Sequence, residues 1–103
     1  TPIRLKKISF KRSSFKKAIF VFYRETDPAG VIKLCNFSRA DFSDATLGQV
    51  TFEDCDLRGV DFTKCNISGK VIFRRCNMRG ASVPKSIILE EPKNKDKMFQ
   101  GKR

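Results

Sequence analysis

The feature that most constrains this chain is a five-residue repeat. From Cys35 the sequence divides into seven successive pentads: CNFSR, ADFSD, ATLGQ, VTFED, CDLRG, VDFTK and CNISG. The third place of each pentad is a large apolar residue, and the first place is always Ala, Val or Cys. Neither the 3.6-residue period of an α-helix nor the 2-residue period of a strand produces such a pattern. A chain that turns a corner every five residues does produce it, which predicts an all-β coil.

The same spacing continues on both sides of this run. After one extra residue near Lys70 the pentads resume as VIFRR, CNMRG and ASVPK, and upstream they are IRLKK, ISFKR, SSFKK and AIFVF. Four corners close one coil of about 20 residues, and coils that pair as strands stack about 4.8 Å apart. Centre residues one coil apart should therefore lie above one another and form the core. The expected columns are Phe37–Leu57–Met78, Phe42–Phe62–Val83, Leu47–Ile67 and Phe52–Phe73.

The run of pentads that includes ADFSD, CDLRG, VDFTK and CNISG resembles the pentapeptide-repeat proteins, whose repeat has the pattern A(D/N)LXX. The resemblance implies a right-handed quadrilateral β-helix, here of about three coils with a basic N-terminal segment and an irregular C-terminal tail. We expect one domain over residues 1–85. Within it, 3–22 are divergent basic pentads, 23–34 are a loop insertion around the turn Asp27-Pro28-Ala29-Gly30, and 35–85 are regular pentads. Residues 86–103 leave the pattern and are expected to form a basic, extended or disordered tail.

A solenoid this short needs covers at its two ends. Each end of the stack exposes apolar core and unpaired backbone unless another segment or a partner lies over it. The N-terminal basic segment, the C-terminal tail and a partner are the three candidates for that role.

Composition argues against catalysis. The chain has no His and no Trp, which removes the usual general base and the Ser–His and Cys–His nucleophile pairs. We therefore expect a non-enzymatic protein with no catalytic residue, no metal site and no cofactor. No apolar run reaches the roughly 20 residues that a membrane-spanning helix needs.

The four cysteines are expected to be structural. Cys35, Cys55 and Cys76 fall in one column of inward first places, and Cys65 falls in another column. None forms the CxxC pair typical of a metal site, and parallel stacked side chains are poorly aimed for a disulfide. Buried, reduced thiols favour a reducing compartment, such as the cytoplasm, the nucleus or an organelle interior.

The charge of the chain is concentrated at its N-terminal end. The net charge is +11, yet the first 24 residues hold eight Lys or Arg and no acid, whereas residues 25–83 are neutral. Such asymmetry indicates a basic end that binds an acidic partner. The pairs Lys6-Lys7, Lys11-Arg12 and Lys16-Lys17 take the last two places of three successive pentads and should project outward as a cationic collar. Arg58 and Arg79 should stack on one face, with Arg39 adjacent. The predicted partner-binding residues are Arg4, Lys6, Lys7, Lys11, Arg12, Lys16, Lys17, Arg58 and Arg79.

Acidic residues have a structural interpretation. Glu53 and Asp54 should stack near Arg74 and Arg75 one coil later, which predicts a ladder of ion pairs. Solvated pairs of this kind contribute little stability each.

Two classes of function fit these observations. The first is a basic binding or scaffold module that docks on nucleic acid or a ribonucleoprotein through phosphate contacts. Base stacking is not expected to contribute, because the Phe residues should be buried. The second is a protein–protein module, either an accessory subunit of a larger complex or an effector that binds an acidic host protein. Some pentapeptide-repeat proteins mimic DNA and act on gyrase, a role that the +11 charge disfavours. For the N-terminal segment, a merely solvated surface and a transit peptide remain alternatives.

Overall fold

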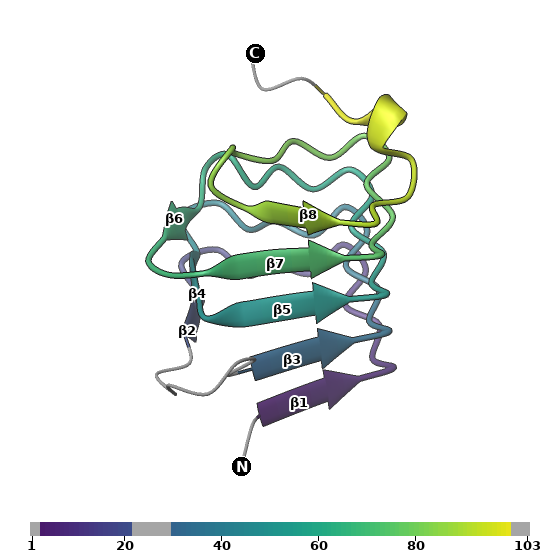
Figure 1. The fold of residues 1–103 in the computed structure, drawn as a ribbon. Helices are drawn as coiled ribbons and strands as arrows, with labels where there is room; N and C mark the ends of the chain where they lie inside the picture. The colour runs from purple at the N-terminus through teal and green to yellow at the C-terminus, as the bar shows by residue number, and fades with distance from the viewer. Residues whose placement is uncertain (1–2, 22–29, 100–103) are drawn as a thin grey trace.

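The computed structural model describes residues 3–21 and 30–99 and, for Ile3, Arg4 and Leu5, only the backbone. The strands form two sheets, each of parallel strands, on adjacent faces of a solenoid (Figure 1). One sheet has five strands in the order β1 (Ile3–Lys6), β3 (Gly30–Lys33), β5 (Val50–Glu53), β7 (Val71–Arg74) and β8 (Ile88–Glu90). The other sheet has three strands in the order β2 (Ile19–Val21), β4 (Thr46–Gly48) and β6 (Asn66–Ile67).

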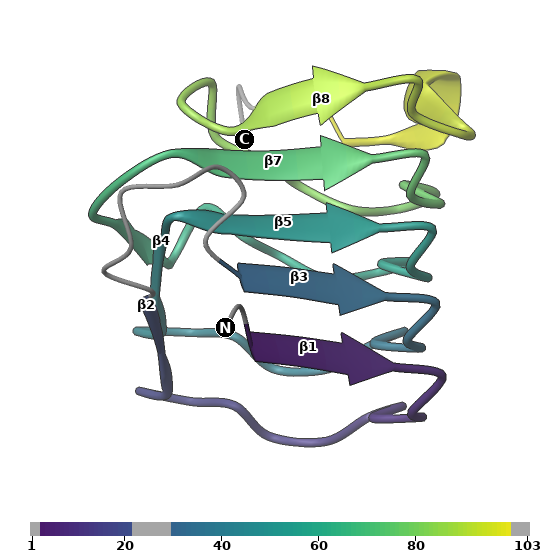
Figure 2. The same cartoon turned by 60° about the horizontal axis from the view of Figure 1, so that its bottom comes forward.

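The other two faces are held by single parallel bridges rather than by strands. One column of bridges links Ser9, Asn36, Asp56, Asn77 and Lys93, and the second pairs Ser14 with Asp41, Asp61 with Ser82 and Ser82 with Phe99. Figure 2 shows the successive coils from another side, with their corners superposed. Four columns of paired backbone make the coil quadrilateral, and the predicted all-β solenoid is confirmed.

Each corner is made by the last places of a pentad. Fifth-place residues take the left-handed conformation, as in Lys7 at φ 59°, Arg39 at φ 60° and Asp54 at φ 55°. The Asn or Asp at the second place accepts a hydrogen bond from the backbone N–H two residues later, an Asx turn that favours the corner. These pairs are Asn36 with Ser38 at 2.8 Å, Asp41 with Ser43 at 2.9 Å, Asp56 with Arg58 at 3.1 Å, Asp61 with Thr63 at 2.9 Å and Asn77 with Arg79 at 3.2 Å.

The core consists of the predicted columns of centre residues. Phe52 is paired in register with Phe73, and Leu47 with Ile67. The rings of Phe42 and Phe62 pack against one another at a tilt of 43°, with their centroids 5.1 Å apart. Most of these side chains are fully buried, and each contributes about 2–3 kcal/mol through removal of apolar surface from water.

The regular stack begins earlier than the sequence predicted. The expected loop insertion over 23–34 contains strand β3, which pairs with β1 on one side and β5 on the other. Gly30 is a small first-place residue and Ile32 is a buried centre residue, so GVIKL is a pentad that lacks the Ala, Val or Cys signature. The remainder of the expected insertion, from 23 to 29, lies outside the described residues.

The tail is also more regular than predicted. Strand β8 pairs with β7, and single bridges join Lys93 to Asn77 and Phe99 to Ser82, around the short 3-10 helix η1 (Lys95–Lys97). Ile87 is buried, and Leu89 and Met98 pack against the core. These apolar residues lie in a segment that is otherwise mostly polar, which explains why the pattern was lost while the backbone still paired. The tail therefore covers the last regular coil, which is one of the three capping alternatives.

Candidate functional site

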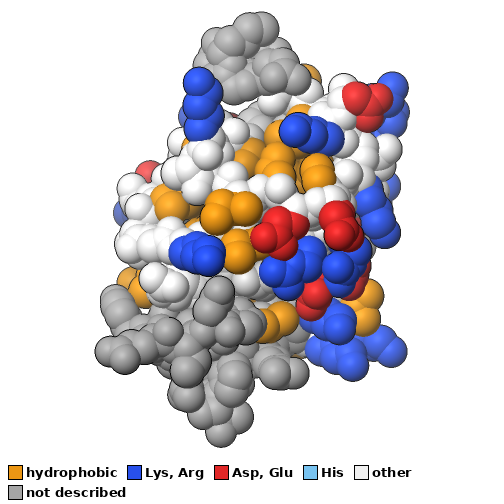
Figure 3. Space-filling model, in the orientation of Figure 1, with side chains coloured by type: hydrophobic (Ala, Val, Ile, Leu, Met, Phe, Trp, Pro, Cys, Tyr) orange, Lys and Arg blue, Asp and Glu red, His pale blue; other side chains and the backbone are white. Residues whose placement is uncertain are grey.

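One corner of the solenoid carries a network of ion pairs. We call it the ladder corner; its residues are Lys33, Glu53, Asp54, Arg74, Arg75, Glu90 and Glu91. Arg75 contacts Glu53 at 2.7 Å and Asp54 at 3.0 Å, and Arg74 contacts Glu90 at 2.6 Å. The predicted ladder is confirmed, and Figure 3 shows acidic and basic side chains interleaved along that edge of the molecule. The hydrogen bond from Arg75 lowers the pKa of Asp54. The charges at this corner are satisfied within the protein.

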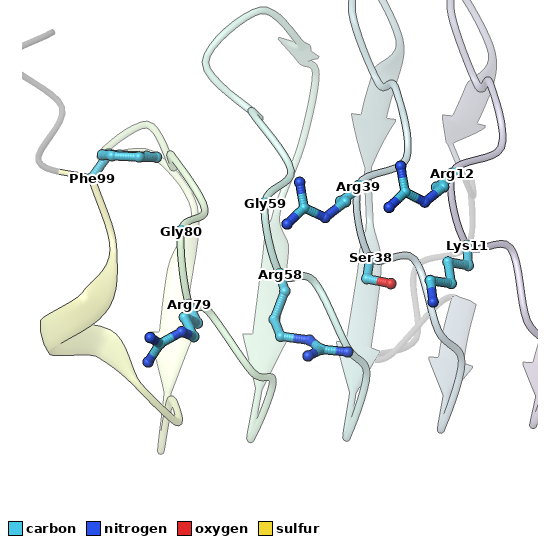
Figure 4. A pocket seen from close by; sticks show the side chains of 9 residues that line it. All are labelled: Lys11, Arg12, Ser38, Arg39, Arg58, Gly59, Arg79, Gly80 and Phe99. Carbon is cyan, nitrogen blue, oxygen red and sulfur yellow. The ribbon is translucent and has the colours of Figure 1, made fainter.

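The next corner along the coil is a shallow groove with a volume of about 510 Å³. We call it the arginine groove, and Figure 4 shows its lining from close by. The lining residues are Lys11, Arg12, Ser38, Arg39, Arg58, Gly59, Arg79, Gly80 and Phe99. Five of these nine residues are Lys or Arg and none is acidic, so a partner in the groove would meet positive charge from several coils.

The backbone ladder aligns these cations. The N–H of Arg12 donates to the carbonyl of Ser38 at 2.9 Å, and the N–H of Arg39 donates to the carbonyl of Arg58 at 2.8 Å. One coil further, the N–H of Gly59 donates to the carbonyl of Arg79 at 3.0 Å. Each coil thus adds one or two basic residues to the same corner, although those of successive coils are about 20 to 27 residues apart in sequence.

Arg58 differs from the other cations of the groove. Its Nε and Nη2 atoms donate to the two carboxylate oxygens of Asp56 at 2.8 and 2.7 Å. Burial would raise the pKa of Asp56, but these bonds and the Arg58 backbone N–H outweigh it, so the pKa of Asp56 is lowered. Among the residues that the structure describes, no ion pair forms at the four others: Lys11, Arg12, Arg39 and Arg79. Most of the positive charge in the groove is therefore uncompensated.

The structure divides the predicted site residues among different corners. It brings Lys11, Arg12, Arg58 and Arg79 together in the arginine groove. The other two pairs of the collar are exposed but belong to other corners; they are Lys6, Lys7, Lys16 and Lys17. The side chain of Arg4 lies outside the described part of the chain. A single straight partner at the groove would therefore contact only part of the collar.

Three features of the groove did not follow from the sequence. Arg39 was expected only as a neighbour, and Ser38 was not among the predicted site residues, although it stands in the fourth-place column with Lys11, Arg58 and Arg79. The expectation that no aromatic side chain is exposed was wrong for Phe99, which is 53% exposed and lines the groove. The position of Arg39 could have been inferred from the repeat, because Arg39 is the fifth residue of its pentad and directly follows Ser38 of the fourth-place column.

The cysteines do not form a second site. All four are free, and three are buried. Burial raises the pKa of Cys65 to about 12 and that of Cys35 above its usual value, and a hydrogen bond with Cys76 raises the pKa of Cys55. Protonated thiols are poor nucleophiles and poor metal ligands. Among residues 3–21 and 30–99, no cluster of three or more Cys, Asp or Glu is placed to hold a metal ion. No helix in the same ranges has the length and apolar character to cross a membrane.

The sequence matches a known protein family. The sequence model of a family described as a pentapeptide repeat region matches residues 32–99. The matched range begins within β3 and ends at Phe99, so it includes the tail that covers the last coil. No curated protein matches the chain.

Proposed function

Because the chain belongs to the pentapeptide-repeat family, which indicates an interaction or scaffold module on a typically non-catalytic fold, we propose that it docks non-enzymatically on nucleic acid. The partner is a nucleic-acid strand, free or in a ribonucleoprotein, and its phosphates lie along the arginine groove. The observation that carries this proposal is the alignment of Lys and Arg from successive coils in a groove whose lining has no acid.

The kind of cation favours phosphate. Four of the five basic residues in the lining are Arg, whose planar guanidinium binds phosphate oxygens through two parallel hydrogen bonds. Arg58 is paired with Asp56, and coils about 4.8 Å apart place the other three, Arg12, Arg39 and Arg79, over about 14 Å, a length that suits a short run of consecutive phosphates.

The exposed ring of Phe99 supports a single strand over a duplex. An exposed aromatic side chain next to a basic groove provides a surface on which an unpaired base stacks, and such stacking tolerates any base. Phe99 lines the groove at the coil next to Gly80 (Figure 4). Bases in a duplex are already stacked on one another and do not offer a free face.

A test compares three probes at increasing salt. Fluorescence anisotropy measures binding of a mixed-sequence single-stranded 12-nucleotide RNA, the matching duplex and a polyglutamate peptide of equal charge. The proposal predicts tightest binding to the single strand, with log K falling about 0.7 per neutralised phosphate per unit log salt. Three or four neutralised phosphates give a slope of about −2 to −3. Tighter binding of polyglutamate, with no preference for RNA, would contradict the proposal.

If the partner is a protein and not a nucleic acid, the chain is still an interaction module. Exposed apolar side chains outside the groove, Ile19 at 74% and Leu34 at 41%, would be its contact residues. We further propose a reducing compartment for this protein, in accord with its free cysteines.

A further inference from the structure

The hydroxyl of Ser38 is a buried polar group without a partner. Ser38 is 3% exposed, and its Oγ is buried with no hydrogen-bond partner among the described residues. The backbone of the same residue is fully engaged, because its N–H donates to Asn36 Oδ1 at 2.8 Å and its carbonyl accepts from Arg12 at 2.9 Å. A buried hydroxyl that forms no hydrogen bond is unfavourable and calls for an explanation.

Two equivalent positions in the same solenoid make the contrast plain. Ser43 and Thr63 also follow a second-place Asp by two residues, and their hydroxyls donate to Asp41 Oδ1 at 2.7 Å and to Asp61 Oδ1. At Ser38 the second-place residue is Asn36, and its amide oxygen accepts only the backbone N–H of Ser38. The Ser38 hydroxyl is therefore turned away from the Asx turn that satisfies the other two hydroxyls.

The Ser38 hydroxyl lies in the lining of the arginine groove. In Figure 4 it points from its own coil toward the neighbouring coil that carries Lys11 and Arg12, with Arg39 adjacent. These three cations are exposed and form no ion pair with a described carboxylate. A hydroxyl donor that faces uncompensated cations is an arrangement that suits an oxyanion.

Arg39 leans toward the next coil, on the side opposite to the one the Ser38 hydroxyl faces, because Gly59 has no side chain there (Figure 4). A Cβ atom at Gly59 would lie 3.4 Å from Arg39 Cγ, so the stem of Arg39 rests against the bare backbone of the next coil. Gly80 continues this bare surface toward Phe99. Arg58, in contrast, is committed to Asp56, which leaves Arg12 and Arg39 as the guanidinium groups available at this end of the groove.

We propose that Ser38, Arg12 and Arg39 form a phosphate-binding subsite, in which the Ser38 hydroxyl donates to a non-bridging oxygen of a phosphodiester in the bound strand. The two guanidinium groups bind the remaining charge, and Lys11 lies at the entrance. This inference rests on the proposed function and names the position in the groove at which one phosphate is held.

The test uses the variants Ser38→Ala and Ser43→Ala. Removal of the unpartnered Ser38 hydroxyl should leave the melting temperature of the free protein unchanged or raise it, whereas Ser43→Ala removes a satisfied hydrogen bond and should lower it slightly. Ser38→Ala should weaken binding of a single-stranded hexauridylate about fivefold to tenfold, in line with loss of one charge-assisted hydrogen bond. It should also abolish the rise in melting temperature that inorganic phosphate produces, while Ser43→Ala should retain both responses.

The outcomes distinguish a failure of the phosphate subsite from a failure of the proposed nucleic-acid binding. If wild-type protein and Ser38→Ala bind hexauridylate equally, the subsite is wrong, although the docking function stands. If hexauridylate does not bind wild-type protein but phosphate raises its melting temperature and not that of Ser38→Ala, the anion site stands and nucleic acid is not its partner. A Ser38→Ala variant that melts well below wild-type protein would show that the hydroxyl has a structural partner, and this would also overturn the subsite.

Discussion

The ladder corner and the arginine groove are neighbouring corners of the coil, and both carry basic side chains, but only the ladder corner also carries the acidic side chains that pair with them. At both, the backbone brings together residues from successive coils. At the ladder corner Glu53 meets Arg74 and Arg75, so each charge is paired inside the protein. At the arginine groove Arg12 lies near Arg39, and no acid of the described chain pairs with either. In this regular solenoid, the charges at one corner are therefore paired within the protein, and those at the next corner are left for a partner.

The two corners make different demands on the free protein. Partly exposed ion pairs contribute up to about 1 kcal/mol each, whereas like charges in proximity repel, and this repulsion is screened by salt. The ladder corner therefore serves stability, and the groove is retained at some cost to stability. The predictions below follow from this division.

The largest effect should come from the core that both corners share. Phe62 is fully buried, with its ring centroid 5.1 Å from Phe42 and 4.8 Å from Phe73. Phe62→Ala should lower the free energy of unfolding by about 3–5 kcal/mol through the cavity it leaves. Chemical denaturation measures this loss, and groove binding should fall with it. Ile19→Ala, at an exposed strand position, is the control and should melt like wild-type protein.

Glu53→Gln should break the ladder corner without affecting the groove. Glu53 contacts Arg75 at 2.7 Å, Arg74 at 3.7 Å and Lys33 at 4.0 Å. Its neutralisation leaves these cations close together and should destabilise the fold by about 0.5–1 kcal/mol, while RNA affinity stays constant. The matched change Glu91→Gln removes a more exposed carboxylate, 3.8 Å from Arg75, and should have no measurable effect. Equal effects from both variants would mean that the ladder carries no specific stability.

Acid pH should loosen the ladder corner. The pKa of Asp54 is lowered from its ordinary value of 3.8 by the hydrogen bond from Arg75. A carboxylate whose pKa is depressed by folding stabilises the protein above the pKa of the unfolded chain, and this contribution disappears as pH falls through the folded value. Thermal stability should therefore decline as pH falls through about 3.8 and below. The decline should be shallower in Asp54→Asn, and identical profiles for the two proteins would argue against the linkage.

The smallest effect should be a gain in stability at the groove. Arg39 has φ 60°, whereas the next two fifth places of that column are Gly59 and Gly80, with φ 72° and 73°. Arg39→Gly should remove the strain of a left-handed backbone at a residue with a side chain, and it should also remove the repulsion between Arg39 and the neighbouring cations. Stability should therefore rise by up to about 1 kcal/mol. RNA affinity should fall in the same variant. A loss of stability would mean that Arg39 contributes contacts within the fold rather than to a partner.

The sequence predicted the parts of the fold that repeat. The columns Phe42–Phe62 and Phe52–Phe73 followed from the period, because one coil requires a fixed number of residues. Strand β3 was missed because Gly30 replaces the usual first-place residue. Strand β8 was missed because its pentad, IILEE, begins with Ile87 in place of Ala, Val or Cys, and the order that follows was missed because Met98 does not continue the five-residue spacing. These segments are defined by pairing with a neighbouring coil, which only the three-dimensional structure provides.

The candidate site was predictable only in part for the same reason. Counting places aligned Arg58 with Arg79 and put the three pairs of the collar on three adjacent faces of one coil, but it did not show that only Lys11 and Arg12 among them line the groove. The orphaned hydroxyl of Ser38 and the exposure of Phe99 depend on side-chain positions. No sequence period contains that information.

The central claim is that the arginine groove, and not the overall positive charge, binds the partner. The direct measurement is RNA affinity for two double variants of equal charge change, Arg12→Glu with Arg39→Glu in the groove and Lys16→Glu with Lys17→Glu at another corner. Both should melt as cooperatively as wild-type protein, because all four side chains are exposed. The groove variant should lose at least tenfold more affinity than the matched variant. Equal losses in the two variants would mean that the partner binds a diffuse basic surface and not the groove.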